Sequence, residues 1–355
     1  MNHNMKNEVI HNSKVDGKTV GIYTIGNGTV SARISNFGAR VIGIDAPDRN
    51  GVLDDIVAGY NELERYIDNK GERFLGATVG RVANRICKGR MTVDGVEYSL
   101  PVNNGINSLH GGIKGIDMVV WDVVCHSDNV LTLHYVAPDG QDGYPGNLDI
   151  TMTFTVTDDN ALDLKYEAVT DKATPVNLSQ HAFFNLKGSR GGTILDHSIT
   201  ICADSITPVD ETLIPTGELM SVEGTPFDFR TPHLIGERIE DKHQQLIFGG
   251  GYDHNWVISG QAGSLRKACV LTEETSGRCV EVYTDQPGMQ FYTGNFFDGS
   301  YDGKVKGIRL GRRDALALET QNFPDAVNHP NFPSCILRPG EKYTQHTFYR
   351  FSVQK

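Results

Sequence analysis

The stretch Asp149-Ile150-Thr151-Met152-Thr153-Phe154-Thr155-Val156 alternates strictly between polar and apolar residues. Because successive side chains of a β-strand point to opposite faces, this spacing predicts a strand with one buried face. The stretch Thr29-Val30-Ser31-Ala32-Arg33-Ile34 shows the same alternation. Turn residues stand next to such runs, with Asp158-Asp159-Asn160 after the first stretch and Asp94-Gly95 between two shorter ones. The pattern predicts antiparallel hairpins in series.

Helical signals are few, limited to one or two turns over residues 61–68 and a short charged helix over 233–245. The chain shows no alternation of strands with long helices, no fixed-period repeat and no Pro/Ser-rich linker. Its 39 glycines in 355 residues exceed the average share of about 7%, as many tight turns would require. We therefore expect an all-β fold, a large antiparallel β-sandwich that forms a single domain over 1–355 and carries its chemistry on loops.

The charge balance excludes several classes of partner. With 33 Lys and Arg against 44 Asp and Glu, the formal charge is −11, which disfavours nucleic acid, and the one basic cluster is Arg309, Arg312 and Arg313.

No window holds the 18 consecutive apolar residues of a membrane span. Residues 1–16 are polar and lack the apolar segment of a secretory signal. We expect this segment to be flexible, the protein to be cytoplasmic, and its six cysteines, which show no C-x-x-C spacing, to be reduced.

Cofactor motifs are absent. Gly17-Lys18-Thr19 imitates the end of a phosphate-binding loop, but Asn12 stands where that loop requires glycine. Gly26-Asn27-Gly28 opens no helix, so dinucleotide binding has no support. No histidine is followed by glutamate, and no G-x-S-x-G or spaced set of metal ligands occurs. We expect neither a cofactor nor a bound metal.

Polar residues interrupt otherwise apolar runs in four parts of the chain. A buried polar group must have a partner or a task, so these parts are candidate site segments. Their Arg, Asn, His, Gln, Asp, Glu and aromatic residues suit a neutral polyhydroxylated ligand, whose hydroxyls need donors and acceptors and whose ring needs an apolar face. The segments are 80–86 with 107–112, 176–186, 251–256 with 286–295, and 317–326. They predict a sugar site.

These segments closely resemble the aldose 1-epimerases, also called galactose mutarotases, from about Gly21 to Val353. The resemblance implies a β-sandwich of the galactose mutarotase type that acts on free aldohexoses, such as galactose and glucose, without a cofactor. The matching motifs are G-R-V-A-N-R-I at 80–86, N-S-L-H-G-G at 107–112, Y-D-H-N at 252–255, P-G-M-Q-F-Y-T-G-N-F at 287–296, L-E-T-Q-N-F-P-D-A at 318–326 and L-R-P-G-E-K-Y at 337–343.

The resemblance makes Glu319 the general base and His181 the general acid. Opening a cyclic hemiacetal requires removal of the proton on O1 and protonation of the ring oxygen O5, which a carboxylate and an imidazolium can do near neutral pH. The residues point the same way, because Glu319 closes the apolar run 315–318 and His181 precedes the apolar run 182–184.

The same resemblance assigns five sugar-contacting residues: Asn84, Arg85, His110, Asp253 and Gln290. The residues alone leave alternatives, namely a turn-stabilising role for His110, an Asx-turn at Asp253, and a structural ion pair for Arg85, with Glu319 as a candidate partner. For Gln290 the alternative is a purely structural amide.

Three residues depart from the family pattern. Gln180 stands where the family commonly has Asn, Phe183 where it often has Tyr, and Phe323 where some members carry Trp. The first two departures put a peripheral hydrogen bond and the sugar preference in question, and the aromatic residues could form either a stacking floor or core.

Other functions stay open at this point. A hexose-6-phosphate 1-epimerase would need a basic pocket, and a glycoside hydrolase would use Asp253 and Glu319 as paired carboxylates. A catalytically silent sugar-binding module should have lost the acid or the base, and both are present. The sequence does not decide between galactose, glucose, xylose and arabinose, nor between a monomer and a homodimer.

Overall fold

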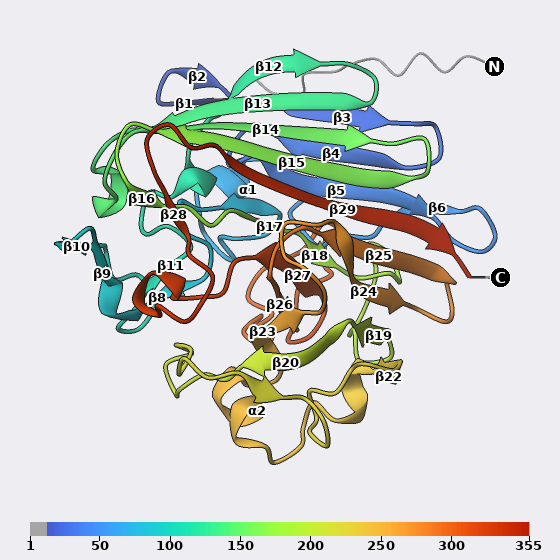
Figure 1. Cartoon of the computed structure of the whole chain (residues 1–355). Coiled ribbons are helices and arrows are strands. Elements are labelled where there is room, and N and C mark those ends of the chain that lie inside the picture. The colour runs from blue at the N-terminus through green and yellow to red at the C-terminus, as the bar shows by residue number, and fades with distance from the viewer. Residues whose placement is uncertain (1–12, 355) are drawn as a thin grey trace.

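The computed structural model describes residues 13–354, and most of its regular structure is β-strand (Figure 1). The largest sheet has nine strands in the order β12-β13-β14-β15-β29-β25-β24-β19-β22. The C-terminal strand β29 lies in its middle, between β15 and β25. Its strands are β12 (Asp122–His126), β13 (Val130–Ala137), β14 (Leu148–Val156), β15 (Ala161–Thr170), β19 (Ser198–Ile201), β22 (His233–Leu234), β24 (Arg266–Thr272), β25 (Arg278–Thr284) and β29 (Tyr343–Val353).

Two smaller sheets complete the β-sandwich. A six-stranded sheet has the order β18-β27-β26-β23-β20-β21, and a four-stranded sheet has the order β3-β4-β5-β6. The strands of the first are β18 (Phe183–Phe184), β20 (Ala203–Thr207), β21 (Met220–Ser221), β23 (Asp253–Ile258), β26 (Gly288–Tyr292) and β27 (Leu316–Gln321). Those of the second are β3 (Ile22–Gly26), β4 (Ser31–Ser35), β5 (Arg40–Pro47) and β6 (Leu53–Asp55). Strand β3 contacts β13 and β14, and β5 contacts β29, so the four-stranded sheet packs against the nine-stranded one.

Five two-stranded ladders connect these sheets, and all the ladders between named strands are antiparallel within residues 13–354. They are β1 (Lys14–Val15) with β2 (Lys18–Thr19), β7 (Ala77–Val79) with β17 (Ser179–His181), β8 (Arg85–Ile86) with β11 (Ser108–Leu109), β9 (Arg90–Val93) with β10 (Val96–Ser99), and β16 (Thr174–Pro175) with β28 (Ile336–Leu337). The expected all-β antiparallel sandwich is confirmed.

The alternation of apolar and polar residues that predicted β14 matches the alternation of buried and half-exposed side chains along this strand. Ile150, Met152, Phe154 and Val156 are fully buried, and the threonines between them lie on the half-exposed face. The turn after Val156 leads directly into β15, which pairs with β14 over its whole length. The hairpin expected around Asp94-Gly95 is the β9–β10 pair.

The helices are short. Helix α1 (Glu64–Ile67) lies inside the expected range 61–68. The prediction of a helix over 233–245 is wrong. His233–Leu234 forms strand β22, which pairs with β19, and only a 3₁₀ turn, Ile235–Glu237, follows this strand. Helix α2 (Gln244–Gly249) begins later, where the His243 Nδ1 accepts the Gln245 N–H at 3.3 Å. Backbone pairing with a distant strand therefore overrides the local charge pattern.

The remaining 3₁₀ turns are Cys87–Gly89, Ile116–Met118, Gln141–Gly143 and Ala326–Asn328. Residues 1–12 lie outside the described part, so the flexibility expected over 1–16 stays a prediction, while Lys14–Val15 forms β1. Over residues 13–354, the helices are all too short or too polar to traverse a bilayer.

Strand β27 places its side chains on two distinct faces. Leu316 and Leu318 enter the main hydrophobic core between the sheets. Ala317 belongs instead to a second cluster that also contains Phe183 and Tyr292. Because side chains alternate along a strand, Glu319 shares the face of Ala317 and points away from the main core.

The packing of β14 predicts that Phe154→Ala destabilises the protein by about 3–5 kcal/mol, because a fully buried ring is replaced by a cavity. Urea unfolding followed by circular dichroism measures this. The control is Thr155→Ala on the opposite, half-exposed face, for which we expect a change within about 0.5 kcal/mol. Equal effects of the two substitutions would contradict the assigned faces of the strand.

Candidate active site

Three adjacent strands of the six-stranded sheet carry the first group of site residues. Gln290 on β26 lies directly opposite Glu319 on β27, and Asp253 on β23 lies opposite Tyr292 on β26. Opposite residues in an antiparallel ladder project to the same face. Glu319, Gln290 and Asp253 therefore share one face of the sheet.

The two histidines come from other parts of the chain. His181 ends β17, which pairs with β7 and contacts β27. His110 follows β11, which pairs with β8, the strand that begins with Arg85. A Cβ on Gly111 would lie 1.8 Å from the Gly80 carbonyl oxygen, so only glycine lets the turn after His110 approach this backbone. This close approach explains the glycine after the histidine in the motif.

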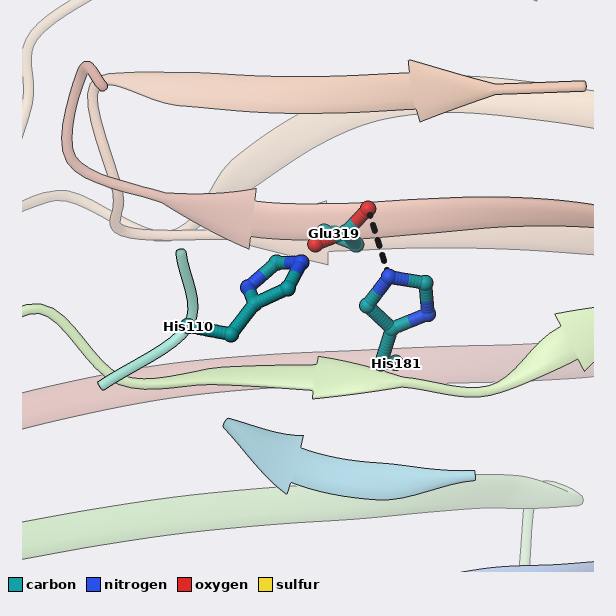
Figure 2. A group of neighbouring side chains, drawn as sticks. All are labelled: His110, His181 and Glu319. Atoms are coloured by element: carbon teal, nitrogen blue, oxygen red, sulfur yellow. Dashed lines mark ion pairs between the residues drawn. The ribbon is translucent and has the colours of Figure 1, made fainter. Parts of the chain in front are cut away.

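These elements surround a cavity of about 620 Å³. Six of the seven residues expected from the sequence line it: Asn84, Arg85, His110, His181, Asp253 and Glu319. Figure 2 shows the side chains of His110, His181 and Glu319 directed toward one another. Gln290 does not line the cavity and lies behind Asp253.

Glu319 and His181 form a buried pair. The His181 Nε2 lies 3.4 Å from the Glu319 Oε1, and the two residues are 4% and 2% exposed, respectively (Figure 2). Within residues 13–354 no protein group hydrogen-bonds to the Glu319 Oε2 or the His181 Nδ1. These two atoms are buried and keep unused hydrogen-bonding capacity, in residues that line the cavity.

Burial controls the protonation of this pair. It raises the pKa of Glu319 well above 4.5, with nearby Asp253 adding to the rise and Arg85 opposing it. It also lowers the pKa of His181 to about 3. Both shifts favour the uncharged side chains, a protonated carboxyl on Glu319 and a neutral imidazole on His181.

His110 is a neutral hydrogen-bond donor. Its Nδ1 accepts the backbone N–H of Asn84 at 3.0 Å, so the proton of the neutral ring must be on Nε2. Burial, with a contribution from His181, lowers the pKa of His110 well below 6.5 and keeps the ring uncharged. The Phe74 ring lies 4.6 Å from it, edge on. The tautomer of His110 is thus fixed by the backbone of Asn84.

The structure brings three potential metal ligands together, which the sequence spacing did not indicate. The ligand atoms of His110, His181 and Glu319 all lie within 4.8 Å of one another. However, a histidine ligand offers a lone pair, and the Nε2 of His110 carries the proton that the Asn84 contact places there. The three side chains as arranged do not fit a metal centre.

Asp253 is held by Gln290, whose Nε2 donates to the Asp253 Oδ1 at 2.8 Å. Burial raises the pKa of Asp253, and Arg85 opposes this rise. Asp253 begins a strand and pairs with Tyr292, so the alternative of an Asx-turn is wrong. Gln290 therefore does not line the cavity but orients Asp253, which does.

Arg85 faces the cavity without forming an ion pair. Its Nε donates to the Asn104 Oδ1 at 3.0 Å, and within residues 13–354 no carboxylate lies within 4.0 Å of its guanidinium nitrogens. The ion pair with Glu319 left open by the sequence is not formed. Asn104, which follows another Asn in the loop before β11, is a site residue that the sequence reasoning missed.

Phe74 was also missed; it lies three residues before the start of β7 and packs against both histidine rings. Of the three departures from the family pattern, Phe183 lines the cavity. Gln180 instead donates to the Thr78 Oγ1 at 3.3 Å, within the protein interior. Phe323 packs against Phe332 and is not among the cavity-lining residues, so it provides no stacking floor there.

Comparison with known proteins identifies relatives over nearly the whole chain. The family model described as aldose 1-epimerase matches residues 21–350. Galactose mutarotase of Mus musculus is 45% identical over 338 residues, 95% of each chain. Aldose 1-epimerase of Escherichia coli K12 is 36% identical over 343 residues, 96% of this chain and 97% of that protein.

Solved structures agree with this match. An aldose epimerase homologue from C. elegans superimposes with a TM-score of 0.87 at 33% identity, over 95% of this chain and all of that one. A galactose 1-epimerase from Lactobacillus acidophilus NCFM superimposes with a TM-score of 0.83 at 30% identity, over 97% of each chain. Fold, sequence and motifs agree along the full length, and the chain belongs to the aldose 1-epimerase family, the isomerases that interconvert sugar anomers.

Proposed function

We propose that this cavity binds a free aldohexose and interconverts its α and β anomers, with Glu319 and His181 as the acid–base pair. The observation that carries the proposal is the buried pair itself, an imidazole and a carboxyl group whose Nε2 and Oε1 atoms lie 3.4 Å apart. Ring opening removes one proton from O1 and adds one to O5, so a pair that holds one proton can catalyse it without proton exchange with solvent.

Sugar binding changes the protonation of Glu319 and His181. Hydroxyl groups that donate to the Glu319 carboxylate favour its ionised form, as Arg85 does. The single proton that the pair carries in this cycle then transfers to His181, which becomes the acid, while the Glu319 carboxylate becomes the base. After rotation about C1–C2, the reverse transfers close the ring on the other face. His110 donates its Nε2–H to an oxygen at the reacting centre.

The charges around the cavity favour a neutral sugar over a phosphorylated one. Among the cavity-lining residues, Glu72, Glu211, Asp253 and Glu319 are acidic, and Arg85 is the one Lys or Arg. The basic cluster of Arg309, Arg312 and Arg313 does not line the cavity, and Arg313 pairs with Glu240. The hexose-6-phosphate alternative therefore lacks its basic pocket.

The remaining alternatives are also less well supported. His181 is the ionisable group paired with Glu319, which a hydrolase with two carboxylates would not require. A silent binding module would not need a buried acid and base in contact. Relatives called galactose mutarotase, at 44–45% identity, support galactose as a substrate.

We further propose that the protein works in the cytoplasm, as a monomer or homodimer, without nucleic acid or a membrane. The formal charge of −11 supports the absence of a nucleic-acid partner.

Replacement of Glu319 by Gln removes the base but keeps a polar group of the same size. We expect the turnover number to fall by about 10² to 10⁴-fold, with sugar affinity largely kept. Polarimetry on freshly dissolved α-D-galactose, with buffer alone as the blank, measures the rate, and calorimetry measures affinity. His181→Asn should behave similarly, and the double variant should lose little more. The exposed Glu218→Gln serves as control, and a near-normal rate for Glu319→Gln would remove Glu319 from this role.

Protonation of the histidines gives a second prediction. The pKa of His181, lowered to about 3, means that this ring stays neutral at pH 5, where the histidines of the unfolded chain, with pKa near 6.5, are mostly charged. The lowered pKa of His110 likewise favours its neutral form. Nitrogen-15 NMR of the ring nitrogens reports charge and tautomer together. We expect the Nε2–H form for His110, and a charged His181 or an Nδ1–H form of His110 would contradict the site as described.

The acidic lining predicts discrimination by charge. The enzyme should accelerate mutarotation of galactose but act on galactose 6-phosphate at least about 10-fold less efficiently, because a phosphate would enter a cavity with excess carboxylates. Polarimetry on both sugars at equal ionic strength measures kcat/KM. Equal or higher efficiency on the phosphate would favour the sugar-phosphate alternative.

A further inference from the structure

Asn177 binds the backbone next to Glu319. It is 1% exposed and lies four residues before His181. Its side-chain Oδ1 accepts the N–H of Asn322 at 2.8 Å, and its Nδ2 donates to the carbonyl of Asn322 at 3.2 Å. Asn322 directly follows β27, three residues after Glu319. One amide thus binds both polar groups of a single backbone residue beside the proposed base.

Asn177 also binds the segment that carries Asn84 and Arg85. Its N–H donates to the Arg81 carbonyl at 3.0 Å, and its carbonyl accepts the Ala83 N–H at 2.6 Å. The two segments form a parallel bridge here, Val82 with Asn177. The segments 81–85, 177–181 and 319–322 therefore meet at this one residue.

The antiparallel register of β18 with β27, continued by two residues, would place His181 opposite Glu319, but the ladder ends before it reaches them. Strand β17 pairs with β7, whereas β27 pairs with β18 and β26. On one side of His181, Phe183 on β18 pairs with Ala317 on β27. On the other side, within residues 13–354, the hydrogen bonds between these segments join the Ser179 Oγ to the Thr320 carbonyl, at 3.1 Å, and the Asn177 side chain to the backbone of Asn322. At that end, side chains rather than a backbone ladder hold the two segments together.

We propose that Asn177 is a positioning residue that sets the separation and alignment of the His181–Glu319 pair. This rests on the proposed function, in which a proton passes between these side chains and the sugar. A displacement of about 1 Å at a reacting centre can cost on the order of 10²-fold in rate. Only a carboxamide offers an acceptor and a donor side by side to match a backbone N–H and C=O, and glutamine would be one methylene too long.

The test uses Asn177→Ala and Asn177→Asp in the full chain, with Asn36→Ala as matched control. Asn36 is 3% exposed, and its side chain makes three bonds to backbone groups, of Gly21, Thr19 and Trp121. The Asn177 side chain likewise makes three, two to Asn322 and one to the Ala83 carbonyl. It does not line the cavity. All three variants should be less stable to urea, which a merely structural role also predicts.

The turnover number distinguishes a positioning role of Asn177 from a merely structural one. We expect Asn177→Ala to lower kcat by about 10 to 10²-fold with KM within about threefold, because Asn177 does not line the cavity, and Asn36→Ala to leave kcat unchanged. Asn177→Asp keeps the acceptor but loses the donor, so its kcat should be intermediate. It is the same size as Asn and carries the test if Asn177→Ala does not fold. Normal kcat in a folded Asn177 variant, or an equal loss in Asn36→Ala, would overturn the proposal.

A crystal structure of the Asn177 variant supplies a readout that does not depend on activity. We expect the His181 Nε2 to Glu319 Oε1 separation to change by at least about 0.5 Å, and an unchanged separation would overturn the proposal. If the wild-type protein accelerates mutarotation of no aldose, the proposed function fails, while this structural comparison still decides whether Asn177 positions the pair.

Discussion

The burial of one carboxyl and one imidazole at 3.4 Å is the constraint around which the site is arranged. Removing two ionisable groups from water is costly unless they exchange a proton or find partners. Here burial raises the pKa of Glu319 and lowers that of His181, so it favours the uncharged form of each side chain. Such a pair can donate and accept in one cycle. Its protonation state therefore depends on the hydrophobic sandwich that excludes water around it.

Local sequence patterns predicted strands but not their order. Alternation in residues 149–156 specifies which face of β14 is buried, and turn residues specify the hairpin with β15. In contrast, β29 pairs with β15 across about half the chain, and nothing local indicates that partner. The error over 233–245 has the same origin, since pairing of His233–Leu234 with β19 depends on a distant strand. The sequence therefore predicted burial faces and hairpins, which depend on neighbouring residues, but not the pairing of strands that are distant along the chain.

The site was predicted through motifs, and the structure changes the meaning of some of them. Six expected residues line the cavity, whereas Gln290, placed opposite Glu319 by register, supports Asp253 from behind. Sequence reasoning named an acid and a base, but the location of the proton requires burial and distances. Likewise, the tautomer of His110 follows from a backbone N–H of Asn84 that no spacing rule identifies.

Asparagine side chains recur where the site segments leave regular sheet. Asn84, with a positive φ of 64°, accepts the Arg85 N–H through its own side chain. Asn322 donates to the carbonyls of Pro333 and Ser334, and Asn177 binds the backbone of Asn322. Irregular backbone must satisfy its polar groups without a ladder, and a short amide can do so with both a donor and an acceptor. The sheets thus provide burial, while these amides join segments at places where no backbone ladder connects them.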